Sequence, residues 1–251
     1  MGANPEQRST RLQTVARFAR YSHAEDSRHE VPPDNAFPHR KRRPLPHIYS
    51  DKEIVRLLEE SSRLGPAGSL RPFTYTTLFG LLVVTGLRLS EALRLRFDDV
   101  GADGLVIRET KFHKSRLVPL HPSAEAALQR YLSVRRRFPT DDPHVFVSLA
   151  GHPLRKDMVG PVFRSLRPKI GLQRGRGARP PRIHDLRHSF CVKALLRCPS
   201  GPDRADRNML AVSTYLGHTE VASTFWYLQA TPELMTGISK SSESLFRGTH
   251  P

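Results

Sequence analysis

An apolar segment over residues 73–85, followed by Gly86, places the strongest limit on how this chain can fold. The segment predicts a buried helix, and glycine is common just past a helix C-terminus because it adopts a left-handed conformation without strain. Arg88 should then lie on a turn directly after a buried helix, and Ser90 can cap the next helix. A backbone held on both sides suits a charged side chain that must not move.

The rest of the pattern predicts a mainly α fold with a small antiparallel β-sheet, of the α+β class. Ser50 and Glu53 form a capping box before a helix over residues 51–63. Residues 105–108 and 116–120 are expected to form two strands, and residues 145–148 a third short one. Further helices are predicted over 122–138, from a cap at Asp157 to 170, over 184–197, 206–216 and 220–229, and from Thr231–Pro232 onwards.

Residues 1–46 differ from the rest of the chain. Residues 11–21 predict one amphipathic helix, because several apolar side chains share a face at helical spacing. Residues 23–46 are rich in proline and charge and read as a linker. Their end is a basic run of Arg40, Lys41, Arg42 and Arg43. We therefore expect two parts, residues 1–46 and residues 47–251.

Charge indicates the class of partner. The chain has 40 Lys and Arg against 24 Asp and Glu, a net charge of +16, which favours a polyanion such as nucleic acid. Its two cysteines, Cys191 and Cys198, form no C-x-x-C and no zinc frame, so a reduced, cytoplasmic setting is expected. No signal peptide or membrane-spanning apolar run is found, and we expect no cofactor and no small-molecule substrate.

Four polar motifs lie far apart in the sequence. They are Thr85–Glu91, which holds Arg88; His184–His188, which holds Arg187; Tyr215–His218; and Tyr227. His184, Arg187 and His188 occupy positions i, i+3 and i+4, a spacing that puts them on one helix face. Two arginines, the histidines His184 and His218, and a late tyrosine suit attack of a phenol on a phosphodiester, because fixed guanidinium groups can hold the charge on pentacoordinate phosphorus.

These motifs resemble the tyrosine recombinases of the phage integrase family. That family has a T-G-L-R-x-S-E turn, a lysine in a β-hairpin, an H-x-L-R-H helix, an L-G-H turn and a tyrosine nine residues after the last histidine. Here His218 and Tyr227 keep that spacing, and residues 111–120 resemble the hairpin pattern K-x-x-K-x-R-x-V-P-L. The resemblance covers roughly residues 47–235.

The resemblance implies a role for each residue. Tyr227 would be the nucleophile that forms a 3′-phosphotyrosine, with Arg88 and Arg187 as the phosphate clamp. His184 would assist the attack, His218 would donate to the non-bridging oxygens, and Lys111 would be the general acid. Lys114 competes with Lys111 for that role; otherwise Lys114 and Arg116 become phosphate contacts. His188 is expected to be structural. The competing interpretation is that His184 and His188 bind a metal ion.

Double-stranded DNA is the expected partner, with Arg40–Arg43 and residues 174–182 as backbone contacts. The likeness predicts a site-specific recombinase or integrase of a mobile element, working as a homo- or hetero-oligomer with other recombinase subunits on DNA. Two alternatives stay open: a type IB topoisomerase-like enzyme, and a catalytically idle DNA-binding partner. The short first part would be the remnant of a core-binding domain.

Overall fold

The computed structural model describes residues 5–33, 45–108, 115–172, 179–197 and 204–217. The chain divides into two compact units, residues 1–44 and 45–251. The first unit holds helix α1, Pro5–Glu25, which is longer than the predicted helix over 11–21. Val15, Phe18 and Tyr21 are exposed on α1. The assignment of this unit as a domain remnant stays a prediction.

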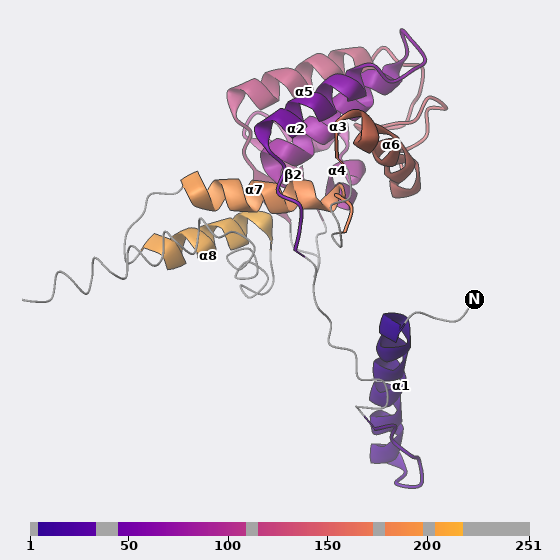
Figure 1. Ribbon diagram of the computed structural model, residues 1–251. Helices are drawn as coiled ribbons and strands as arrows, with labels where there is room; N and C mark the ends of the chain where they lie inside the picture. The colour runs from indigo at the N-terminus through magenta and orange to yellow at the C-terminus, as the bar shows by residue number, and fades with distance from the viewer. Residues whose placement is uncertain (1–4, 34–44, 109–114, 173–178, 198–203, 218–251) are drawn as a thin grey trace, which may run out of the picture. The chain divides into compact units, whose positions relative to one another are not determined.

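The second unit is mainly helical (Figure 1). Helix α3 packs against α2, α5 and α7, while α7 also packs against α8. The predicted fold class, mainly α with a small antiparallel sheet, is therefore confirmed. The helices are α2 Asp51–Ser62, α3 Leu70–Thr85, α4 Leu89–Arg94, α5 Pro122–Arg135, α6 Lys156–Lys169, α7 His184–Arg197 and α8 Arg204–Leu216.

A three-stranded antiparallel sheet follows the short 3₁₀ helix η1, Phe97–Asp99. Its order is β1 (Val100–Gly101), β2 (Gly104–Ile107) and β3 (Arg116–Val118), and Leu105 pairs with both Val100 and Val118. The two strands expected around Lys111 are thus confirmed. The Lys111 loop itself, residues 109–114, lies outside the described residues.

The predicted third strand over residues 145–148 is wrong. This segment makes only isolated bridges, Arg96 with His144 and Val147 with Pro153. The Val145 N–H donates to the Leu95 carbonyl at 2.8 Å, and the Ser148 N–H donates to the His152 carbonyl at 2.8 Å. The chain therefore turns back on itself before a ladder can form, and β1 is the third strand instead.

Two predicted helix caps are also wrong, while the capping box at Ser50 is confirmed. Ser90 lies inside α4, whose N-cap is Arg88. Asp157 lies in the first turn of α6, where it pairs with the N-cap residue Arg155. Both polar side chains lie two positions past the N-cap, where the Asp157 carboxylate is still favourable because of the helix dipole.

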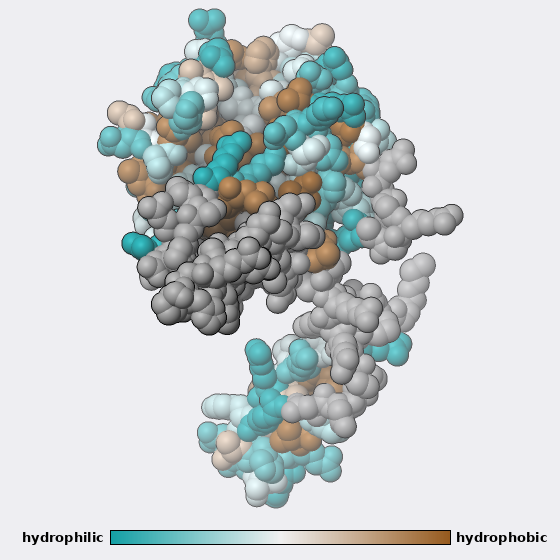
Figure 2. Space-filling model, turned by 60° about the vertical axis from the view of Figure 1, so that its left-hand side comes forward, coloured by the Kyte–Doolittle hydropathy of each residue, from teal (hydrophilic) through white to brown (hydrophobic). Residues whose placement is uncertain are grey.

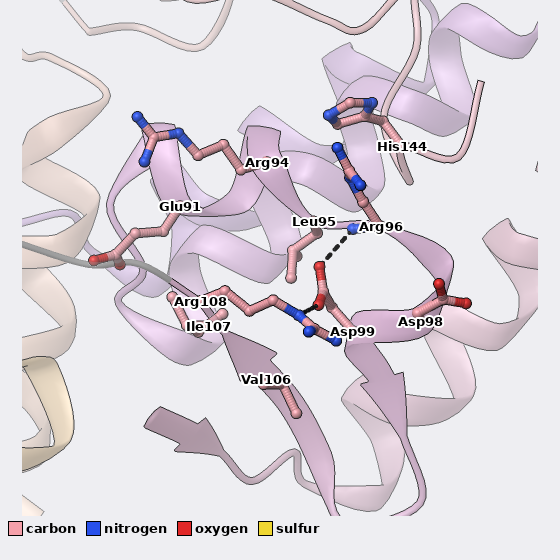
Figure 3. Close-up of a pocket in the computed structure, with 10 residues that line it drawn as sticks. All are labelled: Glu91, Arg94, Leu95, Arg96, Asp98, Asp99, Val106, Ile107, Arg108 and His144. Atoms are coloured by element: carbon pink, nitrogen blue, oxygen red, sulfur yellow. Dashed lines mark hydrogen bonds and ion pairs between the residues drawn. The ribbon is translucent and has the colours of Figure 1, made fainter. Parts of the chain in front are cut away.

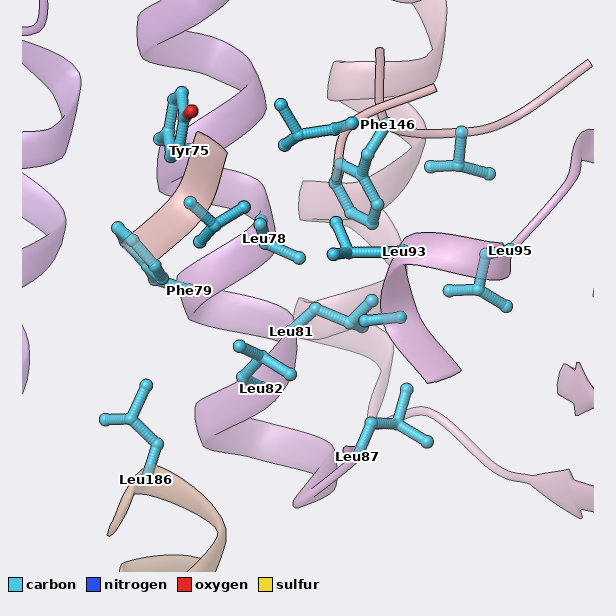
Figure 4. Close-up of a cluster of buried hydrophobic side chains, with 14 of the residues drawn as sticks. Tyr75, Leu78, Phe79, Leu81, Leu82, Leu87, Leu93, Leu95, Phe146 and Leu186 are labelled. Atoms are coloured by element: carbon cyan, nitrogen blue, oxygen red, sulfur yellow. The ribbon is translucent and has the colours of Figure 1, made fainter. Parts of the chain in front are cut away.

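The main core surrounds α3, which accounts for its apolar sequence. Leu78, Phe79 and Leu82 of α3 are almost completely buried, and Leu78 and Phe79 point to different sides of the helix (Figure 4). Leu93 and Phe146 approach from other segments in the same view. A helix buried on several sides is rigid because its neighbours interlock with it. Its C-terminal turn is therefore a stable support for Arg88.

A second, smaller core lies between α7 and α8, built from Cys191, Val192, Met209 and Leu216. On the face seen in Figure 2, hydrophilic and apolar residues of the described part are interspersed over the surface. Within the described residues, no helix is both long and apolar enough to cross a membrane.

Candidate active site

The turn after α3 places Arg88. Gly86 has a φ of 62°, and its N–H donates to the Leu82 carbonyl at 3.0 Å, so the predicted left-handed helix end is confirmed. A side chain there would collide with Phe190 of α7, because a Cβ would lie 2.4 Å from the ring. The Arg88 N–H donates to Glu91 at 2.9 Å, which closes the turn on its other side.

Glu91 is the centre of an ion-pair network. Its carboxylate, 8% exposed, accepts from Arg88 Nη1 at 2.8 Å and from Arg116 Nη2 at 2.9 Å. Arg187 Nη1 lies 4.0 Å from the same carboxylate. Burial opposes ionisation of Glu91, but the hydrogen bonds from Arg116 and Arg88 outweigh it and lower its pKa to about 2. One acidic group thus holds three arginines that would otherwise repel one another.

Arg187 joins two helix ends. Its guanidinium is 3% exposed and donates from Nη1 to the Gly86 carbonyl and from Nη2 to the Leu216 carbonyl, both at 2.8 Å. Gly86 follows α3 and Leu216 ends α8, and carbonyls at helix ends lack partners within the helix. Arg187 therefore satisfies carbonyls from segments that lie more than one hundred residues apart.

The segment before His218 closes this group of side chains. Gly217 has a φ of 64°, and its carbonyl accepts from Arg88 Nη2 at 3.5 Å. Tyr215 stacks on Phe190 with ring centroids 5.6 Å apart. Burial raises the pKa of Tyr215, and the nearby Arg116 and Arg187 act against that rise. The end of α8 is thus packed directly against the arginines.

The two histidines of α7 differ in exposure. His184 is exposed and His188 is buried, and their rings meet edge to face with centroids 4.6 Å apart. His188 Nε2 lies 4.0 Å from Asp185, whose pKa burial raises to about 6. Within the described residues, no group of three or more His, Cys, Asp or Glu side chains could hold a metal ion.

The structure brings Arg88, Arg116 and Arg187 together around Glu91, with His184 at the start of the helix that carries Arg187. The remaining predicted residues lie outside the described residues: Arg40, Lys41, Arg42, Arg43, Lys111, Lys114, His218 and Tyr227. The sequence analysis missed the pairing of Glu91 with Arg116. Their contact joins a helix to a strand 25 positions away, for which no local pattern exists.

A polar pocket of about 460 Å³ lies beside this network, between α4, η1 and β2 (Figure 3). Glu91 is at one side, and Asp99 accepts from both the Arg96 N–H and the Arg108 side chain. Three arginines and three acidic residues line it, so their formal charges cancel. Arg88, Arg187 and His184 are not among its lining residues.

Comparisons with known proteins identify the family of this chain. The phage integrase family model matches residues 47–233. The chain belongs to the phage integrase family. Its activity is accordingly that of a tyrosine recombinase, an enzyme that breaks and rejoins DNA. The resemblance drawn from the motifs is thus confirmed at the level of family and activity.

Sequence alignments with curated relatives extend over most of the chain. The putative integrase/recombinase y4rB of Sinorhizobium fredii (strain NBRC 101917 / NGR234) is 42% identical over 241 residues, 93% of this chain and 77% of the relative. Tyrosine recombinase XerD of Brucella abortus biovar 1 (strain 9-941) is 29% identical over 243 residues, 92% of this chain and 74% of the relative. A lambda integrase dimer bound to a COC′ core site has a similar fold, with a TM-score of 0.61 at 19% identity over 86% of this chain and 57% of that one.

The Glu91 network predicts a pH-dependent stability. A carboxylate with a lowered pKa in the folded chain stabilises the fold above its ordinary pKa of 4.5 and loses that contribution as the pH falls to about 2. Glu91→Gln lacks this contribution. The difference in unfolding free energy between the unaltered chain and the variant should therefore shrink, by about 3 kcal/mol in all, as the pH falls through this range. Urea denaturation at a series of pH values measures it, and a constant difference would contradict it.

Proposed function

We propose that this chain is a site-specific recombinase of a mobile element that cleaves DNA with Tyr227 and rejoins it through a 3′-phosphotyrosine. The observation that carries the proposal is the placement of Arg88 and Arg187. Both guanidinium groups bond to the carbonyls of residues 216–217, immediately before His218 in the sequence. Residues from three distant motifs thus meet at one place, as a phosphate clamp next to a nucleophile requires.

The proposed cleavage step exchanges one phosphoester bond for another. The Tyr227 oxygen attacks phosphorus while His184 assists removal of the phenol proton, because an unperturbed phenol has a pKa of about 10. The bond from phosphorus to the 5′ oxygen breaks, and Lys111 gives that oxygen a proton. The phosphotyrosine keeps the energy of the phosphodiester, so attack by a 5′ hydroxyl reverses the step without ATP.

The clamp stabilises the transition state. Arg88, Arg187 and His218 would donate to the non-bridging oxygens, where charge accumulates as the tyrosine attacks. Each arginine fork matches two phosphate oxygens and stays charged at any relevant pH. By comparison with the loss of single donors elsewhere, each is expected to contribute about 100- to 1000-fold in rate.

Trapping of a covalent adduct tests this function. A duplex nicked just past the cleavage position loses its short 5′ hydroxyl fragment, so the unaltered chain should accumulate a 3′-linked protein–DNA adduct. A DNA-binding partner without activity would give none. Exchange of strands between two duplexes then separates a recombinase from a topoisomerase-like enzyme, which would relax supercoiled DNA without exchange.

The basic run at residues 40–43 is proposed to contact the DNA backbone, together with Lys114. Contacts to phosphates release counterions, so the logarithm of affinity should fall with the logarithm of salt concentration by about 0.9 for each contact. Charge reversal of Arg40–Arg43 should therefore flatten that slope. Reversal of Arg63 and Arg155, two exposed arginines paired with acids of their own, should leave it unchanged. An unaltered slope after the first change would show that the run does not contact DNA.

Assembly on DNA is proposed to use the end of the chain. Residues 231–246 contain Leu234, Met235, Ile238 and Leu245, which offer apolar contacts to a neighbouring subunit, either a copy of this chain or another recombinase. The lambda integrase compared above forms a dimer on its core site. Deletion of residues 232–251 should therefore reduce sedimentation of multi-subunit complexes on DNA along with cleavage. Assembly and cleavage equal to the full chain would mean that this segment is not the connection.

A further inference from the structure

We infer that Arg116 is a positioning residue, which aligns Arg88 through Glu91, rather than a contact to a DNA phosphate. The inference rests on the proposed function, since it concerns the same cleavage step. The sequence pattern placed Arg116 among the phosphate contacts. Its surroundings in the structure favour a different role.

The Arg116 guanidinium is committed to Glu91. Its two terminal nitrogens donate to both carboxylate oxygens, from Nη1 to Oε1 at 3.3 Å and from Nη2 to Oε2 at 2.9 Å. The side chain is only 14% exposed. Arg116 donates to a charged carboxylate, whereas Arg187 donates to uncharged carbonyls. Drawing Arg116 towards a phosphate would therefore leave the buried Glu91 carboxylate without one of its cationic partners.

Glu91 passes this constraint to Arg88. Its Oε1 also accepts from Arg88 Nη1 at 2.8 Å, and its Oε2 accepts from the Arg88 N–H at 2.9 Å. Each carboxylate oxygen is therefore shared between the two arginines. The fork from Arg116 fixes the plane of the carboxylate, and that plane sets the direction in which Arg88 points.

Arg116 also lies against the segment that precedes His218. A Cβ on Gly217 would be 3.1 Å from Arg116 Nη1, so the guanidinium lies close to this backbone. The Gly217 carbonyl accepts from Arg88 Nη2 at 3.5 Å. Strand β3, helix α4 and the end of α8 thus meet at Arg116.

Replacement by lysine separates the two roles. Lysine keeps a positive charge that can contact a phosphate, but it cannot form a planar two-pronged bond to a carboxylate. If Arg116 positions Arg88, Arg116→Lys should slow single-turnover adduct formation on saturating DNA at least tenfold. DNA affinity and its dependence on salt should stay unchanged. If Arg116 contacts a phosphate, Arg116→Lys should cleave like the unaltered chain.

A second measurement shows whether Arg116 acts through Glu91. The rates of adduct formation by the unaltered chain, Glu91→Gln, Arg116→Lys and the double variant form a double-mutant cycle. We expect the double variant to lose no more than the worse single variant, because both changes break the same link. Fully multiplied losses would overturn the inference. Arg130→Lys, an exposed change on α5, serves as the matched control and should cleave normally.

The outcomes also separate this inference from the function on which it rests. Absence of adduct from the unaltered chain would overturn the proposed function and this inference together. Adduct from the unaltered chain with equal cleavage by Arg116→Lys would overturn the inference alone. If Arg116→Lys melts before the assay temperature, Glu91→Gln alone decides: it should slow cleavage without changing the salt dependence, and normal cleavage would overturn the inference.

Discussion

Tyr227→Phe is expected to abolish covalent capture of DNA while leaving DNA binding intact. The change removes one hydroxyl and keeps the ring, so the volume and apolar surface of the side chain are nearly preserved. Without the phenol oxygen, no bond to phosphorus can form. The measurement is adduct formation on a nicked duplex, with affinity measured in parallel at one salt concentration.

Tyr215→Phe is the matched control for this experiment. Tyr215 lies close to the arginine network and stacks on Phe190, so it is the described tyrosine that could be mistaken for the nucleophile. Removal of its hydroxyl should leave adduct formation intact, because the ring keeps its stacking partner. Adduct from Tyr227→Phe, or loss of adduct in Tyr215→Phe alone, would mean that the nucleophile is assigned wrongly.

Gly86→Ala is expected to be the most destabilising small substitution near the site. Alanine at a φ of 62° is strained, and its Cβ would lie 2.4 Å from the Phe190 ring. A left-handed conformation costs about 1–2 kcal/mol and overpacking about 1–3 kcal/mol, so a loss of about 2–5 kcal/mol in unfolding free energy is expected. Thermal or urea denaturation measures it.

Cleavage by Gly86→Ala should fall as well, because the Gly86 carbonyl accepts from Arg187 and Arg88 is two residues away. Gly80→Ala is the matched control, since it makes the same change within α3. A Cβ there meets only Leu58, at an ordinary 3.8 Å. It should raise stability by about 0.5–1 kcal/mol, because alanine is the better helix former. Equal effects of the two substitutions would refute the role given to the Gly86 turn.

Local signals in the sequence were enough for the elements that carry the site. The apolar run before Gly86 predicted a buried helix with a left-handed end, and Arg88 follows that end as expected. The spacing of His184 and Arg187 predicted their shared helix, which runs from His184 to Arg197. These features depend on helical period and on the conformational freedom of glycine, both of which act over a few residues.

Features that depend on contacts between distant segments could not be predicted from the sequence. The third strand was predicted at residues 145–148, yet β1 at Val100–Gly101 takes that place, because Val145 bonds to the Leu95 carbonyl instead of a ladder. The caps at Ser90 and Asp157 failed because neighbouring residues took the N-cap positions.

Patterns in the sequence were enough to predict the family, the fold class and the turn that carries Arg88. How the arginines are held depends on the folded chain: Arg116 and Arg88 share Glu91, and Arg187 bonds to carbonyls at the ends of α3 and α8. These partners lie up to 101 residues apart in the chain. A charge that becomes buried when the helices pack must pair with an opposite charge or with a carbonyl. These partners come from distant segments, so no periodic pattern in the sequence predicts them.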